Sequence, residues 1–423
     1  MDFGAGLPGG TQFALHSFSS GAWERGFFYR MGFMNRFFLL PFLFAALAGC
    51  NPAAGPPPIV IGHVSDKTRQ DKAGDQAELG IRLALKQMDN EALAKVLGGR
   101  GIQVRHTDTR GVLDAFESQA VRLESVNRSF ALLGGLSVQE TAALHHAKVP
   151  LLTMHGQPVA GASNLVFYLG MPPIQQGAAL AKAVADGSNL KRITILLDEK
   201  RLEAVAVAES FQKALTAARV AAKTTPVAVT TLRFGDDPSS PSRVPEDVRW
   251  REVIERLIGH EADTVLFAGS VQDFNAWHKM LRREFLDSNP HIVYAGADGS
   301  HRLFEIEASD KMPVTMATAF FADPASEKIT AFMKAYKEAF QVEADVQAVL
   351  AYDGFRMLVE AVKRANAPLT PDRIREQLLN TKDFDGLTGP LTITADRHVQ
   401  RSVYAVSWQN GTMKLVRPLA GQN

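Results

Sequence analysis

The chain has 423 residues, of which 45 are acidic and 46 are basic, and it contains a single cysteine. Such balanced charge argues against a nucleic-acid partner, because neutralising phosphates calls for a basic face. One cysteine rules out an intramolecular disulfide framework and a cysteine cluster that could bind a metal ion. The length is long for one domain and suits two domains of ordinary size.

An export signal is predicted at residues 34–50. A positive charge at Arg36 precedes an almost purely apolar run at 37–46, and small residues stand just before Cys50, which is the layout of a signal peptide. A membrane-spanning helix needs about 20 apolar residues, so a cleaved signal fits this run better than a permanent anchor. The competing interpretation is a buried apolar helix with an inert core thiol.

The stretches on either side of the signal do not resemble a folded body. Residues 1–31 are rich in Gly, Ser and Phe and show no period, and a start at Met31 or Met34 would suffice, which suggests an over-extended reading frame. Residues 1–50 are therefore grouped as an N-terminal extension with a signal. Residues 51–58 are rich in proline, which disfavours helix and gives a stiff spacer, so this segment is predicted to be a tether.

From residue 59 onward the sequence alternates short apolar runs with longer amphipathic stretches, which predicts strands followed by helices. Several of the apolar runs are continuous, as is typical of parallel strands buried on both faces. The pattern predicts an α/β fold with doubly wound sheets. The predicted strand and helix pairs are 59–64 with 75–89, 102–106 with 114–126, 130–133 with 137–147, 192–197 with 203–218, and 264–268 with 271–285.

Two later segments depart from this alternation. Residues 234–246 are dense in Pro, Ser and Asp and are predicted to form a surface loop. Strands are predicted at 391–393, 402–408 and 413–416, and Asn410-Gly411 between the last two favours a hairpin.

Polar residues and glycines follow several of the predicted strands. Ligands of open α/β sheets bind outside the carboxyl ends of the strands, so these loops are predicted to carry a binding site. Turn formation alone is the alternative explanation. The loops are 64–66, 134–137, 268–270 and 296–299, and they contain Ser65, Asp66, Ser137, Ser270 and Asp298.

The sequence lacks the motifs of common enzymes, because it has no Walker loop, no G-x-S-x-G elbow and no H-E-x-x-H. Neighbours on a helix point about 100° apart, so the adjacent His145 and His146 are interpreted as helix surface and not as a metal site. Ser137 and His155 could act as nucleophile and base, but no third residue that would orient them is evident, and plain hydrogen bonding is favoured. No enzyme activity, metal or cofactor is predicted.

Short motifs connect the chain to known families. The Leu-Ala-Gly-Cys run that ends at Cys50 resembles the box of bacterial lipoprotein signals, whose cysteine becomes acylated. Residues 59–416 resemble the type 1 periplasmic binding proteins, in particular the substrate-binding lipoproteins of branched-chain amino acid ABC transporters. The matching segments are 80–84, 134–137, 149–153, 176–177, 296–299, 351–353 and 384–390, of which the last is similar to the family's F-x-G-x-T-G-P run.

The resemblance implies two lobes joined by three chain crossings, expected near Gly170, Thr318 and Leu387. Lobe I would comprise 59–170 and 319–386, and lobe II would comprise 171–318 and 387–417. The ligand would lie in the cleft, and closure would depend on its contacts to both lobes. Acylation of Cys50 would anchor the protein to a membrane, because two or more acyl chains bind a bilayer stably.

The resemblance also implies a ligand site, from which this chain departs. The amino-acid binders hold the α-carboxylate of the ligand with a Ser and a Thr, where this chain has Val138 and Gln157, while Asp298 matches the acid that pairs with the ammonium group. An unpaired buried carboxylate is costly, so a ligand other than a standard branched-chain amino acid is expected. The expected ligand-binding residues are Ser65, Asp66, Ser137, Val138, Thr153, His155, Gly156, Gln157, Glu203, Ser270 and Asp298.

Two function classes remain open. The first is a lipid-anchored, extracytoplasmic solute-binding protein of an ABC importer, with permease subunits as partners and a small polar ligand that is amino-acid-like or amide-like. The second is a ligand-poor member of the same fold that acts as an envelope sensor or protein-binding lipoprotein. An enzyme is a distant third. A cleft filled by its own side chains would favour the second class.

Overall fold

A computed structural model describes residues 56–144, 147–185, 190–234, 246–285, 290–296, 313–365, 367–409 and 412–419. Several predictions fall on residues outside these ranges: the signal with Cys50, the His145-His146 pair, most of the 234–246 loop, Asp298, and the Asn410-Gly411 turn. Within the described ranges, no helix is both long and apolar enough to cross a membrane.

Lobe I contains a five-stranded parallel sheet in the order β2-β1-β3-β4-β5. Four of its strands, β1, β3, β4 and β5, are almost entirely buried, whereas the edge strand β2 is mostly half-buried. They are β1 (Ile59–Ser65), β2 (Ile102–Asp108), β3 (Ala131–Gly134), β4 (Leu151–Thr153) and β5 (Val166–Tyr168).

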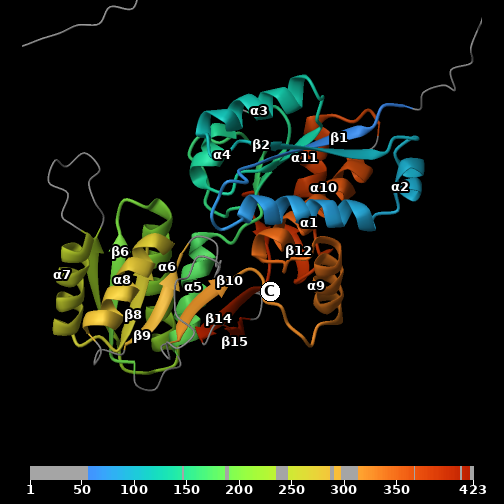
Figure 1. Cartoon of the computed structure of the whole chain (residues 1–423). Helices are drawn as coiled ribbons and strands as arrows, with labels where there is room; N and C mark the ends of the chain where they lie inside the picture. The colour runs from blue at the N-terminus through green and yellow to red at the C-terminus, as the bar shows by residue number, and fades with distance from the viewer. Residues whose placement is uncertain are drawn as a thin grey trace, which may run out of the picture. The chain divides into compact units, whose positions relative to one another are not determined.

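Helices cover both faces of this sheet (Figure 1). Ile59 and Ile61 of β1 point to the face covered by α1 and α10, whereas Val64 packs with α3 and α4 on the opposite face. This is the alternation that strand geometry requires. The helices of lobe I are α1 (Ala73–Gln87), α2 (Asn90–Val96), α3 (Leu113–Ser125), α4 (Val138–Leu144), α9 (Glu327–Phe340), α10 (Val346–Ala365) and α11 (Pro371–Leu379).

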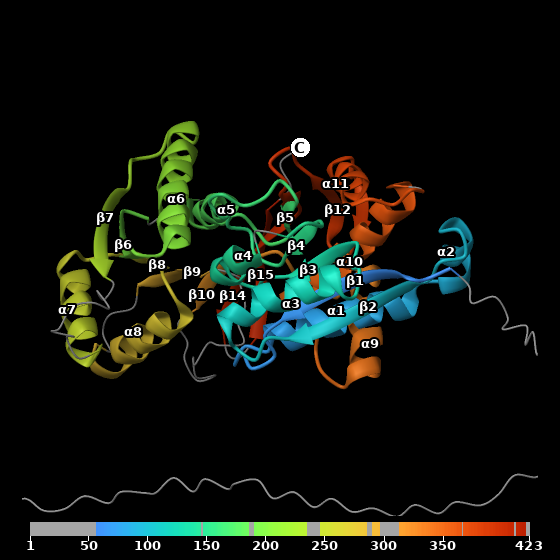
Figure 2. The same ribbon diagram turned by 90° about the horizontal axis from the view of Figure 1, so that it is seen from above.

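Lobe II is built on a seven-stranded sheet in the order β15-β14-β10-β9-β8-β6-β7. The pairs from β10 to β7 are parallel, and β14 joins β10 in the antiparallel direction. Figure 2 shows α5 and α6 on one side of it and α7 and α8 on the other. The elements are α5 (Pro173–Ala185), β6 (Arg192–Asp198), α6 (Leu202–Ala221), β7 (Ala228–Phe234), α7 (Glu246–Gly259), β8 (Thr264–Ala268), α8 (Val271–Glu284), β9 (His291–Ala295), β10 (Val314–Thr318), β14 (Val403–Gln409) and β15 (Thr412–Leu419).

The chain passes between the two cores near Gly170 and near Thr318. It leaves β5 after Tyr168 and enters lobe II at α5, and it returns after Thr318, because Ala319 and Phe320 already pack in the core of lobe I. The third crossing was expected near Leu387, but Leu387, Leu391, Ile393 and Val399 all belong to the core of lobe I.

Residues 384–400 stay with lobe I because they form a small antiparallel sheet that packs onto it. This sheet consists of β11 (Phe384–Gly386), β12 (Gly389–Ile393) and β13 (Val399–Gln400). The Arg397 carbonyl accepts a hydrogen bond from the Tyr168 N–H at 2.9 Å, which ties the segment to β5. The lobe limits expected from the sequence therefore need correction, and we propose 59–170 with 319–400 for lobe I and 171–318 with 403–419 for lobe II.

Two of the motifs that carried the family resemblance contact each other. Asp353 of α10 is fully buried and both of its carboxylate oxygens accept from the Leu387 N–H at 3.1 Å. Burial raises the pKa of Asp353 to about 6, although the Arg401 guanidinium and the Leu387 N–H oppose that rise. Gly389, which starts β12, has φ of +111°, a backbone conformation that favours glycine.

Candidate ligand-binding site

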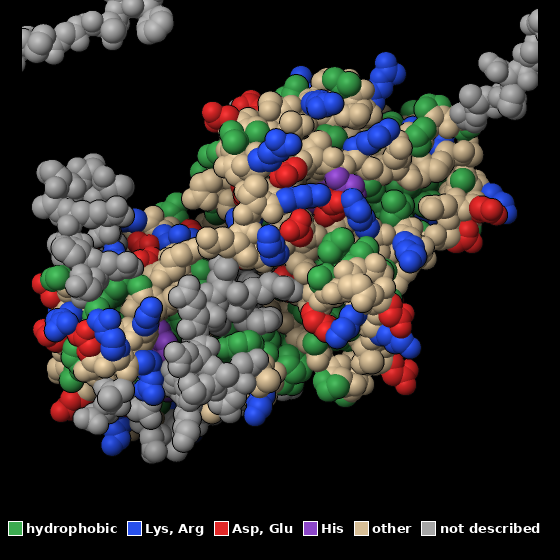
Figure 3. Space-filling model, in the orientation of Figure 1, with side chains coloured by type: hydrophobic (Ala, Val, Ile, Leu, Met, Phe, Trp, Pro, Cys, Tyr) green, Lys and Arg blue, Asp and Glu red, His purple; other side chains and the backbone are tan. Residues whose placement is uncertain are grey.

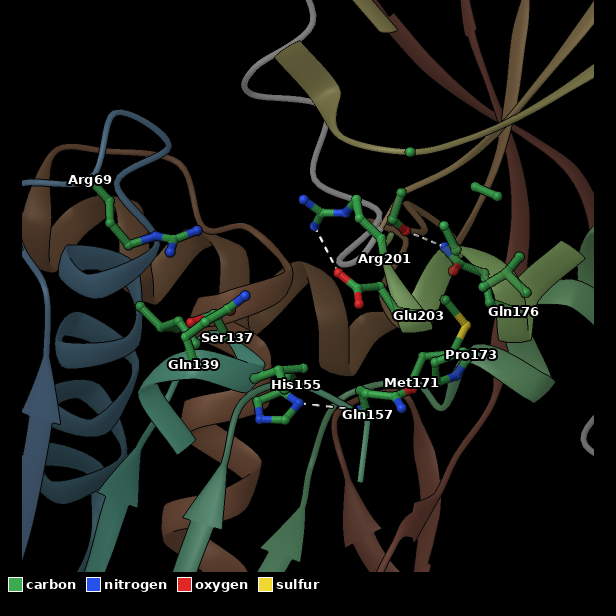
Figure 4. A pocket seen from close by; sticks show the side chains of 18 residues that line it. Arg69, Ser137, Gln139, His155, Gln157, Met171, Pro173, Gln176, Arg201 and Glu203 are labelled. Atoms are coloured by element: carbon green, nitrogen blue, oxygen red, sulfur yellow. Dashed lines mark hydrogen bonds and ion pairs between the residues drawn. The ribbon is translucent and has the colours of Figure 1, made fainter. Parts of the chain in front are cut away.

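A cavity of about 190 Å³ lies between side chains of the two lobes (Figure 4). Most of its lining follows the carboxyl ends of β3, β4, β6, β8 and β9, which is where open α/β sheets bind ligands. Lobe I contributes Arg69, Leu136, Ser137, Val138, Gln139, His155, Gly156 and Gln157, and lobe II contributes Met171, Pro173, Gln176, Arg201, Glu203, Ala204, Val207, Gly269, Ala295 and Gly296.

Buried Glu140 organises the first part of the lobe I wall. One carboxylate oxygen accepts from the Leu136 N–H at 2.5 Å, and the Glu140 N–H donates to Ser137 Oγ at 3.2 Å. The other oxygen lies 3.5 Å from the guanidinium of Arg69, which also bonds Asp71. Burial raises the pKa of Glu140, and the Leu136 N–H and Arg69 counteract only part of that rise. These bonds fix the Leu136-Ser137 loop against the cavity.

A neutral histidine forms the second part of the lobe I wall. His155 Nδ1 accepts from the Gln157 N–H at 3.2 Å, so the proton must be on Nε2, which donates to Thr141 Oγ1 at 2.6 Å. Burial, with a smaller contribution from the nearby His398, lowers the pKa of His155 to about 4. The ring is therefore neutral at neutral pH, and both of its nitrogens are already bonded within the protein.

The lobe II wall contains one buried and one partly exposed polar contact. Gln176 is buried and donates from Nε2 to the Gly296 carbonyl at 2.5 Å. Arg201 and Glu203 form an ion pair at 2.8 Å at the start of α6, with side chains that are 38% and 22% exposed. Figure 4 shows this pair facing the cavity across from His155 and Gln157. The pair can therefore rearrange more readily than the buried contacts.

The structure brings together six of the residues expected at the site: Ser137, Val138, His155, Gly156, Gln157 and Glu203. Four others do not line the cavity. Thr153 is buried and donates to the His155 carbonyl, Ser270 caps α8 through the Asp273 N–H, and Asp66 accepts from Thr68 within its own turn. Ser65 is buried at the end of β1. Asp298 lies outside the described residues.

Sequence reasoning missed several polar residues of the lining, chiefly Arg69, Gln139, Gln176 and Arg201. Two of them had a detectable signal. Arg201 stands two residues before Glu203 in the loop after β6, and Gln176 belongs to one of the motifs that carried the family resemblance. Arg69 gave no such signal, because the path of the β1–α1 loop is set by contacts with distant residues such as Glu140.

Two lobes that share one cavity define a binding protein of the two-lobe class. A model of the periplasmic binding protein family matches residues 58–412, and the chain belongs to this family. Membership of a family of periplasmic binding proteins makes the chain a binding protein and not an enzyme, as expected, and implies an extracytoplasmic location.

Solved structures share the fold at low sequence identity. A leucine-binding protein, LivK, from Thermotoga maritima is 20% identical with a TM-score of 0.67, and the match covers 84% of this chain and 97% of that one. LivJ from Streptococcus pneumoniae in complex with isoleucine is 21% identical with a TM-score of 0.65, over 85% and 100% of the chains.

A third neighbour was solved with a different kind of ligand. A solute-binding protein from R. palustris in complex with 4-hydroxybenzoate is 16% identical with a TM-score of 0.66, over 86% and 96% of the chains. No curated protein matches the sequence. The expected resemblance to branched-chain amino acid binding proteins and the two-lobe α/β fold are both confirmed.

Proposed function

We propose that this protein is the solute receptor of an ABC importer and binds a small polar ligand, amino-acid-like or amide-like, in the cavity between the lobes. The observation that carries the proposal is the open cavity with polar side chains from both lobes. A ligand held by both walls stabilises the closed arrangement, because only contacts to both lobes distinguish closed from open. The cavity is smaller than the roughly 300–1,000 Å³ of sites for drug-sized molecules, which suits a metabolite.

The side chains at the cavity support a ligand other than a standard branched-chain amino acid. Val138 lines the cavity where the amino-acid binders have a hydroxyl, and Gln157 brings an amide. Amide side chains both donate and accept hydrogen bonds, so Gln139 and Gln157 complement an amide or a neutral polar group. Neighbours of the same fold with aromatic acid ligands support the view that this fold accepts more than amino acids.

The alternative is a ligand-poor protein that senses or binds another protein in the cell envelope. It is favoured by the fact that both arginines of the cavity are already paired with acids, Arg69 with Asp71 and Arg201 with Glu203. The unfilled cavity supports the first function over this one.

The test is mass spectrometry of small molecules released when the purified protein is denatured. A stoichiometric small molecule supports the receptor function, and its structure gives the ligand class. Titrating it back should reduce the radius of gyration in small-angle X-ray scattering, because closure brings the lobes together. Absence of any bound molecule, or an unchanged radius at saturation, would favour the sensor or scaffold.

The same proposal includes a lipid anchor on Cys50 and permease subunits as partners. It is supported by the position of the single cysteine at the end of the Leu-Ala-Gly-Cys run. Cys50→Ser should move the protein from the membrane fraction to the soluble fraction, because acyl chains supply the membrane affinity. A variant that fractionates with membranes as the parent does would contradict the anchor.

A further inference from the structure

A second polar site lies inside lobe I, apart from the residues that line the ligand cavity. His63 and His106 are direct partners in the register of the parallel strands β1 and β2. Glu78 projects onto the same face of the sheet from α1. Figure 3 shows histidine side chains at the surface between β2 and α1, among basic and acidic side chains.

The three side chains converge on one point. Nδ1 of His63 lies 3.0 Å from Nδ1 of His106, and Glu78 Oε2 lies 4.0 Å from the same atom of His106. One ligand atom from each residue falls within 4.8 Å of the others. His63 and Glu78 are buried and His106 is half-buried, so packing keeps the three side chains close together.

The two facing imidazoles are a poor pair for one another. The two Nδ1 atoms face each other, so only one of the neutral rings can carry its proton there and donate it to the other. In either case His63 Nε2 remains buried without a hydrogen-bond partner among the described residues. Burial lowers the pKa of both rings, that of His106 to about 4, and neutral imidazole is the form that binds metals. A cation in place of the shared proton would be bound by the Nδ1 lone pairs of both rings.

We propose that His63, His106 and Glu78 bind a divalent transition-metal ion through Nδ1, Nδ1 and Oε2. Metal–nitrogen bonds of about 2.0–2.1 Å place two nitrogens that are 3.0 Å apart close to a right angle around one ion. The carboxylate oxygen reaches the ion after a small rotation of the Glu78 side chain. Two imidazoles with one carboxylate suit Zn²⁺, Ni²⁺ or Cu²⁺ better than Mg²⁺ or Ca²⁺, which prefer all-oxygen sites.

Lys67 competes with the metal ion for the carboxylate. Its ammonium contacts Glu78 Oε2, the proposed ligand atom, while Arg82 contacts the other oxygen. The Lys67 side chain is 34% exposed, so it can turn into solvent when an ion arrives. Arg82 can keep its contact and orient the carboxylate, as outer-shell partners of metal ligands do.

The test is zinc titration of the purified full-length protein by calorimetry, with four variants. His63→Gln and His106→Gln should each weaken zinc affinity by more than about tenfold, the least that even an outer-shell loss costs. Lys67→Met should strengthen it, because the competing ammonium is gone. His260→Gln, a histidine of lobe II outside the cluster, is the matched control and should bind zinc as the parent does.

Lys67→Met separates a metal site from a merely structural polar cluster, since only a metal site gains affinity when the competitor is removed. X-ray absorption of the zinc-loaded parent keeps the test valid if a histidine variant misfolds. It should show two imidazole rings and no sulfur. No zinc binding by the parent up to millimolar ion, unchanged affinity in both cluster histidine variants, weaker binding by Lys67→Met, or sulfur from Cys50 in the zinc shell would each overturn the site.

Discussion

The two walls of the ligand cavity are built differently. On lobe I, the polar groups are buried and bonded to their own neighbours, as in the contacts of Glu140 with the Leu136 N–H and of His155 with Thr141. On lobe II, Gln176 makes one such buried bond to the Gly296 carbonyl, but Arg201 and Glu203 pair with each other in partial contact with solvent. Buried hydrogen-bond networks are rigid, because breaking them leaves polar groups unpaired.

The difference suggests separate roles for the two walls. An exposed ion pair contributes roughly 0–1 kcal/mol, so it gives way to a ligand at little cost. We therefore expect the lobe I wall to determine the shape that a ligand must match, and the Arg201–Glu203 pair of the lobe II wall to adjust to the ligand on closure. Each of the following predictions tests this contrast, from the largest expected effect to the smallest.

The largest expected effect is a loss of stability at acidic pH, caused by protonation of the neutral histidine in the lobe I wall. The pKa of His155 is about 4 in the folded protein and near 6.5 in the unfolded chain. Keeping this histidine neutral and buried contributes about 3 kcal/mol to the free energy of unfolding. The contribution is fully present above pH 6.5 and is lost as the pH falls towards 4. Denaturant unfolding across this range should show it.

His155→Gln isolates that contribution, because an amide can bond Thr141 and the Gln157 N–H without titrating. Between pH 6.5 and 4, the free energy of unfolding of this variant should fall less than that of the parent. That of the control, His260→Gln, should fall as much as that of the parent. An identical pH profile for His155→Gln and the parent would mean that this ring does not titrate as its burial requires.

The second prediction concerns a residue assigned to lobe II, Asp298. We propose, from sequence alone, that Asp298 binds a donor group of the ligand. Asp298→Asn keeps the turn-forming shape and removes the charge, so the affinity should fall by about 1.5–3 kcal/mol. Affinity and melting temperature should be measured together. Affinity that stays constant, or falls only in step with stability, removes Asp298 from the site.

The third prediction concerns the acid that fixes the lobe I wall. Glu140→Ala leaves the buried Leu136 N–H without its acceptor, which should lower the free energy of unfolding by about 1–3 kcal/mol. Urea denaturation at neutral pH measures this. The matched control is Glu203→Ala on lobe II, and comparable losses in both variants would erase the contrast between the walls.

The smallest effect is expected for the exposed pair itself. Arg201→Ala or Glu203→Ala should change the free energy of unfolding by no more than about 1 kcal/mol, and the double variant by about as much as either single one. Ligand affinity should change more than stability does. Destabilisation well beyond this by either variant would show that lobe II, too, has a rigid wall.

Local sequence signals predicted much of this architecture. The alternation of apolar runs and amphipathic stretches predicted β1, β2 and β3 of the first sheet and β6 and β8 of the second, and the loop after β3 reaches the cavity. The strands β7, β9 and β10 were not predicted. The third crossing was misplaced because the apolar residues of β12 show only that the strand is buried. Which lobe receives Leu391 is decided by packing against residues far away in the chain.

The site was harder to predict, for a geometric reason. The side-chain alternation of β4 ends with the strand at Thr153, which is buried and bonds the His155 carbonyl, whereas His155 belongs to the loop that follows and lines the cavity. Arg69 depends on the path of a loop, and the His63, His106 and Glu78 cluster depends on the register of two strands. Neither is encoded in local spacing.

The late return of the chain to lobe II bears on how a newly made chain folds. The β10 strand is buried on both faces, and its outer edge is covered only by β14, which is made some eighty residues later in the chain. Until the C-terminal hairpin arrives, that edge offers unpaired backbone groups between apolar side chains, a template for aggregation. Strands that pair across such a long sequence separation also form slowly. Nascent chains that end before β14 should therefore be the species most in need of a chaperone.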